Sequence, residues 1–385
     1  EEWLLIWKDL RYGRVNAAAA SSEDLLAIKV IVEKIDPDKL CEVGENVEGA
    51  IEGALRSAAS KGMIMAPRSH IRRDPGMFGR GEGPDPEYTE TDVFTLQWHI
   101  THACDLHCKH CYDRSKRRAV TVPESRKLLG HLKELCRVKR VRGHVCFTGG
   151  NPFMHPEMPE IYRTAVRYGF STSILGNPVG RDALSRIVDI RRPGYYQVSL
   201  EGLPEHNDSI RGEGNFHNVI EFLGTLRDLG VSSAVMLTLT RDNMDQVIPL
   251  AERLRGHAEY FTFNRLSQVG EGAQLALPER DEYLEFLERY VKASEDNPII
   301  GFKDNLINLI LDRAGDGVFG GCTGHGCGAA FNFLTVLPDG EVHACRKFPS
   351  VLGNALERPL LDIYDSDEAG KYRKGSEACS GCGLR

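Results

Sequence analysis

Three cysteines, Cys104, Cys108 and Cys111, lie close together at C-x3-C-x2-C spacing. They follow an apolar run at residues 93–100 that is predicted as a β-strand, so we expect all three on one short loop. Three thiolates on one loop can bind three irons of a four-iron cluster. The fourth iron would then have no protein ligand, and an open metal position can bind a reactant. The spacing therefore predicts an iron–sulfur centre that does chemistry.

A zinc ion is the alternative occupant of this loop. Zinc in structural sites takes four ligands, commonly from C-x2-C pairs. His107 and His110 lie within the same loop and would complete such a set. The strand context of the cysteines favours the iron–sulfur interpretation.

A second group of cysteines lies near the C-terminus and comprises Cys322, Cys327, Cys345, Cys379 and Cys382. One cluster needs only four of these five thiolates. One possible set is Cys322, Cys327 and Cys345 with a later cysteine. The other is Cys327, Cys345, Cys379 and Cys382, and a zinc ribbon is the alternative to both.

Charge and cysteine usage exclude several classes of protein. The chain has 385 residues, a net charge of −7 and a pI of about 6.0, whereas general nucleic-acid binders are basic. No apolar run approaches the roughly 20 residues that span a bilayer, so we expect neither a nucleic acid nor a membrane as partner. The first residues lack the pattern of a signal peptide. Clustered cysteines without a secretory signal favour metal ligation in the cytoplasm over disulfides.

An alternation of strands and helices positions the first cysteine loop. Helical patterns separate six predicted strands, at residues 93–100, 144–147, 171–175, 195–200, 233–239 and 260–264. This order predicts an α/β fold, in which right-handed crossovers curl a parallel sheet into a partial (β/α)6 TIM-like barrel over residues 93–314. Active sites in such folds lie at the carboxyl ends of the strands, where the cysteine loop is expected.

Three further regions surround the predicted barrel. Residues 1–67 are predicted as a small separate domain with a strand at 3–7, a helix that begins at Ser21, a helix at 47–60 and a strand at 63–65. Residues 68–92 are rich in glycine, proline and charge, which is typical of a linker. Residues 315–385 contain short strands, turns and the second cysteine group, and are predicted as a cysteine-rich domain.

The C-x3-C-x2-C loop after a first strand resembles the radical S-adenosylmethionine (SAM) enzymes. The resemblance implies that Cys104, Cys108 and Cys111 ligate a catalytic 4Fe–4S cluster whose open iron binds the amino and carboxylate groups of SAM. Reductive cleavage of SAM then gives methionine and a 5′-deoxyadenosyl radical that abstracts a substrate hydrogen. It further implies that His110 lies against the adenine.

The end of the second strand matches another motif of this family. The chain has Gly-Gly-Asn-Pro where the family usually has Gly-Gly-Glu-Pro, which implies four SAM-binding residues: Thr148, Gly149, Gly150 and Asn151. The glycines would let the backbone approach the SAM amino group. The amide oxygen of Asn151 would accept a hydrogen bond, without the charge of the usual Glu.

The fourth strand ends in Ser-Leu-Glu-Gly at residues 199–202, and Arg211-Gly212 follows. Relatives have Ser-Leu-Asp-Gly and Arg-Gly at these places. The match implies that Ser199 bonds the ribose hydroxyls and that Arg211 binds the SAM carboxylate through its planar fork. Glu201 would bind SAM or face the substrate.

The second cysteine group resembles the start of the SPASM and twitch domains, C-x9–15-G-x4-C. Here Cys327 is followed by 12 residues, Gly340, 4 residues and Cys345. Residues 338–340 read Pro-Asp-Gly and are predicted as a hairpin turn that sets the two cysteines on neighbouring strands. The resemblance implies one or two auxiliary 4Fe–4S clusters.

Enzymes with this combination often crosslink, epimerise or oxidise ribosomally made peptides. Residues 1–67 resemble the small winged-helix-like elements that hold a leader peptide, although a packing domain without a ligand is equally compatible with them. We therefore expect a peptide maturase that acts on a precursor peptide and receives electrons from a flavodoxin- or ferredoxin-type donor. The alternatives are a sulfatase-maturase-like enzyme, a small-molecule radical SAM dehydrogenase, or a non-enzymatic iron–sulfur or zinc protein.

Overall fold

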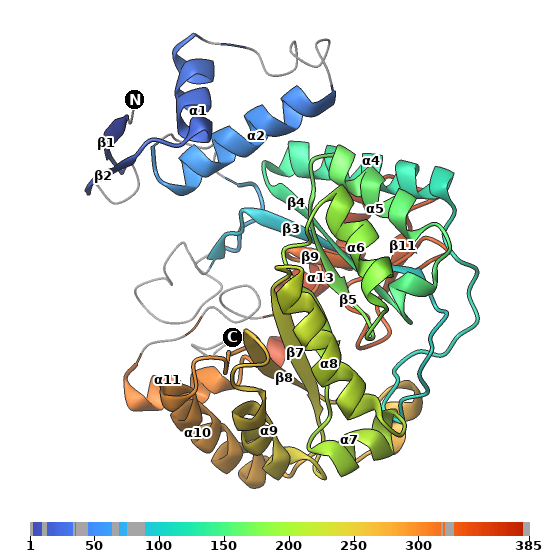
Figure 1. Ribbon diagram of the computed structural model, residues 1–385. Coiled ribbons are helices and arrows are strands. Elements are labelled where there is room, and N and C mark those ends of the chain that lie inside the picture. Colours follow the sequence, from blue (N-terminus) through green and yellow to red (C-terminus); the bar gives the residue numbers. More distant parts are fainter. Residues whose placement is uncertain are drawn as a thin grey trace. The chain divides into compact units, whose positions relative to one another are not determined.

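The chain divides into two compact units in the computed structural model, one of residues 1–68 with 167–169 and one of the remainder (Figure 1). The structure describes residues 3–9, 14–33, 35, 45–63, 69–74, 89–316, 319 and 327–379. Most of the predicted linker lies outside these residues, as do Cys322, Cys382, the side chain of Cys379 and most of the strand predicted at 63–65. In the part of the chain that the structure describes, no helix is long and apolar enough to cross a membrane.

The N-terminal unit contains a two-stranded antiparallel sheet and two helices. Strand β1 (Leu4–Lys8) pairs with β2 (Val15–Ala19), and helices α1 (Ser22–Val32) and α2 (Glu45–Ser60) follow. Ser21 caps α1 in a capping box with Asp24. The sequence did not indicate β2, because a run of alanines has a low β propensity.

The second unit is built on a nine-stranded sheet in the order β11-β10-β9-β3-β4-β5-β6-β7-β8. Six consecutive parallel strands form most of it: β3 (Val93–Thr101), β4 (Arg142–Gly149), β5 (Ser171–Leu175), β6 (Tyr196–Ser199), β7 (Ser233–Leu239) and β8 (Tyr260–Arg265). The predicted parallel sheet is therefore confirmed.

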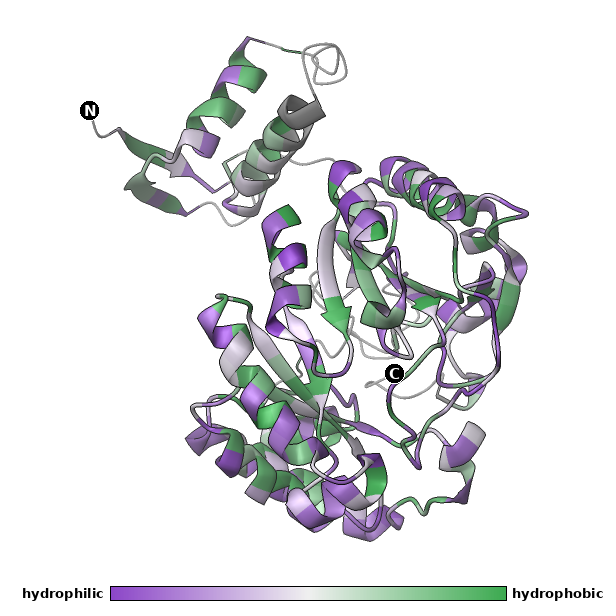
Figure 2. Cartoon of the chain, turned by 45° about the vertical axis from the view of Figure 1, so that its right-hand side comes forward, coloured by the Kyte–Doolittle hydropathy of each residue, from purple (hydrophilic) through white to green (hydrophobic). Residues whose placement is uncertain are grey.

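Helices alternate with these strands, as the periodicity predicts. They are α4 (Val122–Lys139), α5 (Met158–Arg167), α6 (Arg181–Ile190), α7 (Pro204–Arg211), α8 (Asn215–Asp228), α9 (Val247–Leu254), α10 (Arg280–Asp296) and α11 (Ile307–Ala314). They carry both hydrophobic and hydrophilic residues, as Figure 2 shows, which suits helices that pack on a sheet with one side only.

One face of the sheet is apolar, and we call it the helix face. Its buried side chains include Phe94, Leu96, Trp98, Val145, Phe147, Ile174, Tyr196, Val198, Val235, Leu237, Phe261 and Phe263. Aromatic pairs join this face to the helices, since Phe147 contacts Tyr162 of α5 and Tyr196 contacts Phe222 of α8. The helix face is thus the main hydrophobic core of this unit.

The opposite face of the same strands is polar, and we call it the polar face. By strand alternation and register it carries Thr95, Gln97, His99, His144, Cys146, Thr148, Ser171, Ser173, Gln197, Ser199, Thr238, Thr262 and Asn264. Strands buried on both faces would be apolar on both. A polar face therefore indicates a surface that receives loops, cofactors or substrate.

The C-terminal region continues this sheet. Strand β9 (Phe333–Val336) pairs in parallel with β3, and β10 (Glu341–His343) and β11 (Val351–Asn354) follow in antiparallel pairing. The turn between β9 and β10 needs Gly340, whose φ is +88° and whose Cβ would lie 2.5 Å from Asn354 Oδ1. Helices α12 (Leu360–Tyr364) and α13 (Asp367–Lys374) complete the described region.

Candidate active site

The cysteine loop leaves the carboxyl end of β3 and is held by the end of β4. The amide of Gly150 donates to Thr101 O at 3.0 Å, and the amide of Asn151 donates to Ala103 O at 2.8 Å. A Cβ on Gly149 would lie 2.1 Å from Thr101 O, and one on Gly150 would lie 2.2 Å from Ala103 O. The structure thus explains both glycines by close approach to the backbone that leads into the loop. An approach to the SAM amino group stays a prediction.

Two further segments hold the loop from its other side. The amide of Lys109 donates to Ile210 O at the end of α7, at 3.1 Å, and the amide of Glu271 donates to Cys111 O at 2.9 Å. Gly270 has a φ of +59°, and a Cβ there would lie 2.5 Å from Tyr112 O. The cysteine loop is therefore held by four segments: β3, the end of β4, the end of α7, and the segment that contains Gly270 and Glu271.

Polar side chains approach two of the sulfurs. Arg211 Nη1 lies 3.7 Å from Cys108 Sγ, and Asn177 Nδ2 lies 3.5 Å from Cys104 Sγ. Burial raises the pKa of the Cys108 thiol, and the charge of Arg211 opposes this effect. Donors directed at sulfur stabilise a thiolate, which is the form that binds iron.

A single metal ion and a cluster differ in how closely their donor side chains must converge. Within the described residues, no group of three or more His, Cys, Asp and Glu side chains converges tightly enough to hold one metal ion. A zinc site would require such convergence, because all its ligands contact one atom. An iron–sulfur cluster separates its cysteine ligands, since each binds a different iron. Cys104, Cys108 and Cys111 are free thiols, each half-buried, and they suit that role.

Glu201 is the centre of a buried polar network beside the loop. Its Oε1 accepts hydrogen bonds from Arg211 Nε at 2.9 Å and Nη2 at 2.5 Å, and its Oε2 accepts from the Thr238 amide at 2.7 Å. His110 Nε2 lies 3.4 Å from Oε1. Four of the predicted site residues therefore meet here, namely Cys108, His110, Glu201 and Arg211.

Charges in this network keep Glu201 ionised. Burial raises the pKa of Glu201, but the charges of His110 and Arg211 and the hydrogen bonds from Thr238 and Arg211 outweigh burial and bring it below its ordinary value. Burial lowers the pKa of His110, so Arg211 is the permanent cation of the network. Arg211 already uses two nitrogens on Glu201, and only Nη1 is directed at the cysteine loop.

Asn151 is buried, and its side chain faces the protein. Its Oδ1 accepts from the Phe153 amide at 3.2 Å, and its Nδ2 donates to Asp105 Oδ1 at 3.0 Å. Asn177 Nδ2 also donates to Asp105 Oδ1, at 2.7 Å. The Asn151 oxygen therefore already accepts one hydrogen bond within the protein, and its contact with the cofactor stays a prediction.

Ser199 and Thr148 lie at the carboxyl ends of β6 and β4, on the polar face, and both are half-buried. Among the described residues, none hydrogen-bonds the Ser199 hydroxyl. It is thus free to meet a ligand, as the ribose assignment requires.

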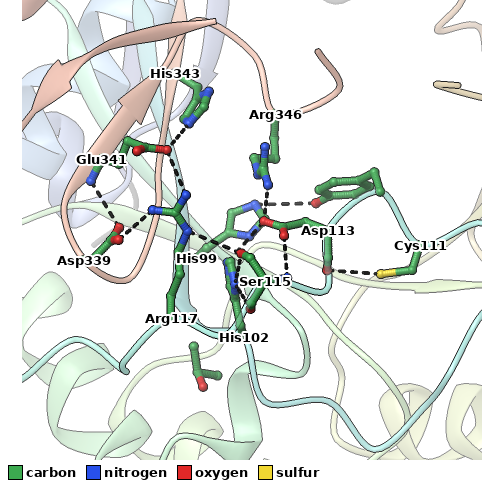
Figure 3. Close-up of polar contacts among 12 residues, drawn as sticks. His99, His102, Cys111, Asp113, Ser115, Arg117, Asp339, Glu341, His343 and Arg346 are labelled. Carbon is green, nitrogen blue, oxygen red and sulfur yellow. Dashed lines mark hydrogen bonds and ion pairs between the residues drawn. The ribbon is translucent and has the colours of Figure 1, made fainter. Parts of the chain in front are cut away.

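A second polar cluster joins the cysteine loop to the C-terminal region (Figure 3). The Asp113 carboxylate, two residues after Cys111, pairs with Arg346, which follows Cys345. Arg117 pairs with Asp339 at 2.6 Å and with Glu341 at 3.0 Å. These contacts fix the hairpin that carries Cys345 against the loop that carries Cys111.

Burial and pairing set the protonation of this second cluster. Burial alone would raise the pKa of Asp113, but hydrogen bonds from Ser115 and Arg346 lower it to about 2. Burial and the charges of His102 and Arg346 lower the pKa of His99 to about 3. Sequence reasoning missed Asp113, Arg117 and Arg346, because no local spacing relates residues more than 200 positions apart.

Two of the auxiliary cysteines have described side chains. Cys327 is exposed and Cys345 is half-buried. The guanidinium of Arg73 donates to Cys327 O and lies over the Phe331 ring at 4.3 Å. Which of the five cysteines share a cluster stays open.

Comparisons with known proteins agree with this geometry. Residues 98–254 match the model of the radical SAM superfamily, and residues 327–383 match that of the SPASM iron–sulfur cluster-binding domain. The chain is similar to the antilisterial bacteriocin subtilosin biosynthesis protein AlbA of Bacillus subtilis, with 25% identity over 69% of this chain and 58% of that protein. The match therefore spans less than two thirds of that relative's length.

Two other related proteins are matched over more of their own length. The mycofactocin maturase MftC of Mycolicibacterium smegmatis is 29% identical over 75% of this chain and 75% of that protein. The crystal structure of SuiB from Streptococcus suis, bound to the precursor peptide SuiA, has a TM-score of 0.61. The alignment covers 99% of this chain and 92% of that chain at 15% identity, which indicates a shared fold.

Proposed function

Since this chain is a radical SAM enzyme with a SPASM domain, we propose that it modifies a ribosomally made precursor peptide. Its cofactors are a 4Fe–4S cluster with SAM and auxiliary iron–sulfur clusters. The observation that carries the peptide assignment is the N-terminal unit, because neither SAM binding nor cluster binding requires it. The fold it shares with SuiB, a protein solved with its precursor peptide, supports the same assignment.

Cys104, Cys108 and Cys111 hold the catalytic cluster in this proposal. When bound, the cluster and SAM supply reductive carbon–sulfur cleavage and hydrogen abstraction. Arg211, fixed by Glu201, directs one nitrogen at the cysteine loop and stabilises negative charge there. Ser199 offers its hydroxyl from the end of β6 to the ribose, and His110 packs beside the adenine.

The polar face receives the core of the peptide. Peptide backbone carries one donor and one acceptor for nearly every residue, and these must find partners when water is excluded. The polar face offers hydroxyl and amide groups along adjacent strands, including Gln97 and Gln197. A flavodoxin- or ferredoxin-type protein supplies the electron.

The N-terminal unit binds the leader part of the peptide as a winged-helix-like element. Its β1–β2 hairpin exposes four large apolar side chains: Trp3, Leu4, Ile6 and Val15 are 62%, 66%, 68% and 72% exposed. Exposed apolar residues gathered on one small hairpin are typical of a binding surface.

The test uses the full chain and short peptides encoded near its gene, screened for one whose mass the wild-type enzyme changes. Ile6→Glu should weaken binding of this peptide by about 10-fold or more, since a buried apolar contact is replaced by a charge. SAM cleavage without peptide should be unchanged. Val32→Glu is the matched control, because Val32 is equally exposed but lies at the end of α1.

Two results would contradict the proposal. One is equal peptide affinity of the Ile6→Glu and wild-type enzymes, which would remove the leader-binding role of the N-terminal unit. The other is a wild-type enzyme that cleaves SAM but changes the mass of none of these peptides, which would favour the small-molecule alternative.

A further inference from the structure

We infer that the carboxylate of Asp105 supplies the negative charge that binds the α-ammonium group of SAM. The inference rests on the SAM site proposed above and is independent of the peptide substrate. It concerns a residue that no motif match singled out. Asp105 lies within the cysteine loop, directly after Cys104.

The first argument is the orientation of the carboxylate. Asp105 Oδ1 accepts hydrogen bonds from Asn177 Nδ2 at 2.7 Å and from Asn151 Nδ2 at 3.0 Å. The two amides come from different places, one after β5 and one at the end of β4. A surface carboxylate held by two side-chain donors from separate strand ends has lost most of its rotamer freedom before any ligand arrives.

The second argument is the charge that remains on Asp105. Both donors are neutral amides, and in the described part of the chain no Lys, Arg or His lies within ion-pair distance of this carboxylate. Its Oδ2 accepts no hydrogen bond from the described residues. Asp105 is exposed despite its two partners, so a cation can reach it. An oriented carboxylate without a cation is suited to an ammonium group.

Two other carboxylates beside the loop, those of Glu201 and Asp113, are already used. Glu201 is buried and accepts hydrogen bonds on both oxygens. Asp113 is paired with Arg346. Of these three acidic side chains, Asp105 alone combines exposure with an unused oxygen.

The third argument is the position where this chain departs from its relatives. Asn151 stands where relatives usually have Glu. The structure shows that the side-chain oxygen of Asn151 accepts a hydrogen bond from the Phe153 amide. The side-chain nitrogen of Asn151 donates a hydrogen bond to the carboxylate of Asp105. The residue that lacks the expected charge is therefore in direct contact with a residue that carries one. The negative charge has moved from the end of β4 to the neighbouring cysteine loop.

The experiment measures equilibrium binding of SAM to the cluster-loaded enzyme. Asp105→Asn keeps the size of the side chain and removes its charge, so SAM affinity should fall roughly 10- to 100-fold. The deamino analogue of SAM, which lacks the α-amino group, should bind the wild-type and Asp105→Asn enzymes equally. Iron content should be unchanged, which separates this effect from loss of the cluster.

Two further variants sharpen the result. SAM also carries a positive sulfonium, so any nearby acid attracts it. Glu271→Gln controls for this effect, because the backbone amide of Glu271 donates a hydrogen bond to Cys111 O and so holds this residue against the loop. Loss of the Glu271 charge should change SAM affinity less than threefold. Returning the charge to its usual position with Asn151→Asp in the Asp105→Asn background should restore part of the affinity.

Each outcome supports or overturns the inference. Unchanged SAM affinity in Asp105→Asn overturns it, and so does an equal loss for SAM and the deamino analogue, because the residue would then only shape the loop. Failure of the wild-type enzyme to bind SAM overturns the SAM site as a whole. A loss confined to SAM, with partial recovery in the double variant, supports it.

Discussion

The two faces of the nine-stranded sheet differ sharply in chemistry although the same strands form both. On β3, Phe94, Leu96 and Trp98 point to the helix face and are fully buried. Thr95, Gln97 and His99 alternate with them on the polar face. One face is packed against helices, and on the other His99 contacts Tyr112 of the cysteine loop.

The contrast shows where stability and function reside. The helix face excludes water and supplies most of the hydrophobic stabilisation. The polar face gives up that stabilisation: His99, Ser173 and Thr262 are buried on it as polar groups, whereas Thr148 and Ser199 are half-buried at strand ends. Substitutions on the two faces should therefore have separable effects.

The largest expected difference is between neighbours on β3. Leu96→Ala removes a fully buried side chain from the helix face and should lower the free energy of unfolding by about 2–5 kcal/mol. Thr95→Ala, one residue away on the polar face, should change it by less than about 1 kcal/mol. Urea unfolding under anaerobic conditions measures both. Similar losses for the two variants would mean that the faces are not distinct.

Glu201 is an exception to the contrast between the two faces, because it lies beside the polar face and is also buried. A substitution there should affect both stability and SAM binding. Glu201→Gln should cost about 1.5–3 kcal/mol of stability, since one amide oxygen must replace two carboxylate oxygens that accept from Arg211 and Thr238. SAM affinity should fall as well, because Arg211 loses its anchor. Glu205→Gln, at an exposed site in α7, is the control and should do neither. A stable Glu201→Gln enzyme with normal SAM affinity would remove Glu201 from the site.

At neutral pH the smallest expected effect is that of His144, because its contribution to stability changes only as the pH falls. His144 bonds Ser171 at 2.9 Å and Ser173 at 2.8 Å on the polar face, and burial lowers its pKa to about 4. An unfolded His binds its proton near pH 6.5, so between about pH 6.5 and 4 the unfolded chain holds more protons and stability falls as pH falls. His144→Gln should reduce this slope by up to about 1.4 kcal/mol per pH unit. Unfolding midpoints measured at several pH values test this prediction. Identical pH dependence for the wild-type and His144→Gln proteins would contradict the lowered pKa of His144.

Much of the fold was predictable because its signals are local. The strands of the barrel are short apolar runs between helical patterns, and all six appear in the sheet at nearly the expected residues. The C-x3-C-x2-C loop was predictable because its three cysteines lie within eight residues of sequence. Pro338-Asp339-Gly340 likewise forms its turn, since the positive φ of Gly340 is a local requirement.

The missing parts depend on contacts between distant residues. Sequence motifs assigned Arg211 to a cofactor carboxylate, but only the structure shows that Glu201 holds two of its nitrogens. Asp105 and Asn177 are 72 positions apart, and neither has a spacing that relates it to the other. The hydrogen bonds of Asn151 to the Phe153 amide and to Asp105 likewise appear only in the structure. Such pairings follow from strand order and cannot be read from a single stretch.

The central claim is that the loop with Cys104, Cys108 and Cys111 carries the radical chemistry. The most direct measurement is formation of 5′-deoxyadenosine from SAM by the anaerobic, reduced, iron-loaded enzyme. The wild-type chain should form it, and the variant with all three cysteines replaced by alanine should form none. The Cys136→Ala enzyme should retain this activity, because Cys136 is a buried residue of helix α4 and lies outside the cysteine loop. Product from the triple variant at the wild-type rate would contradict the account.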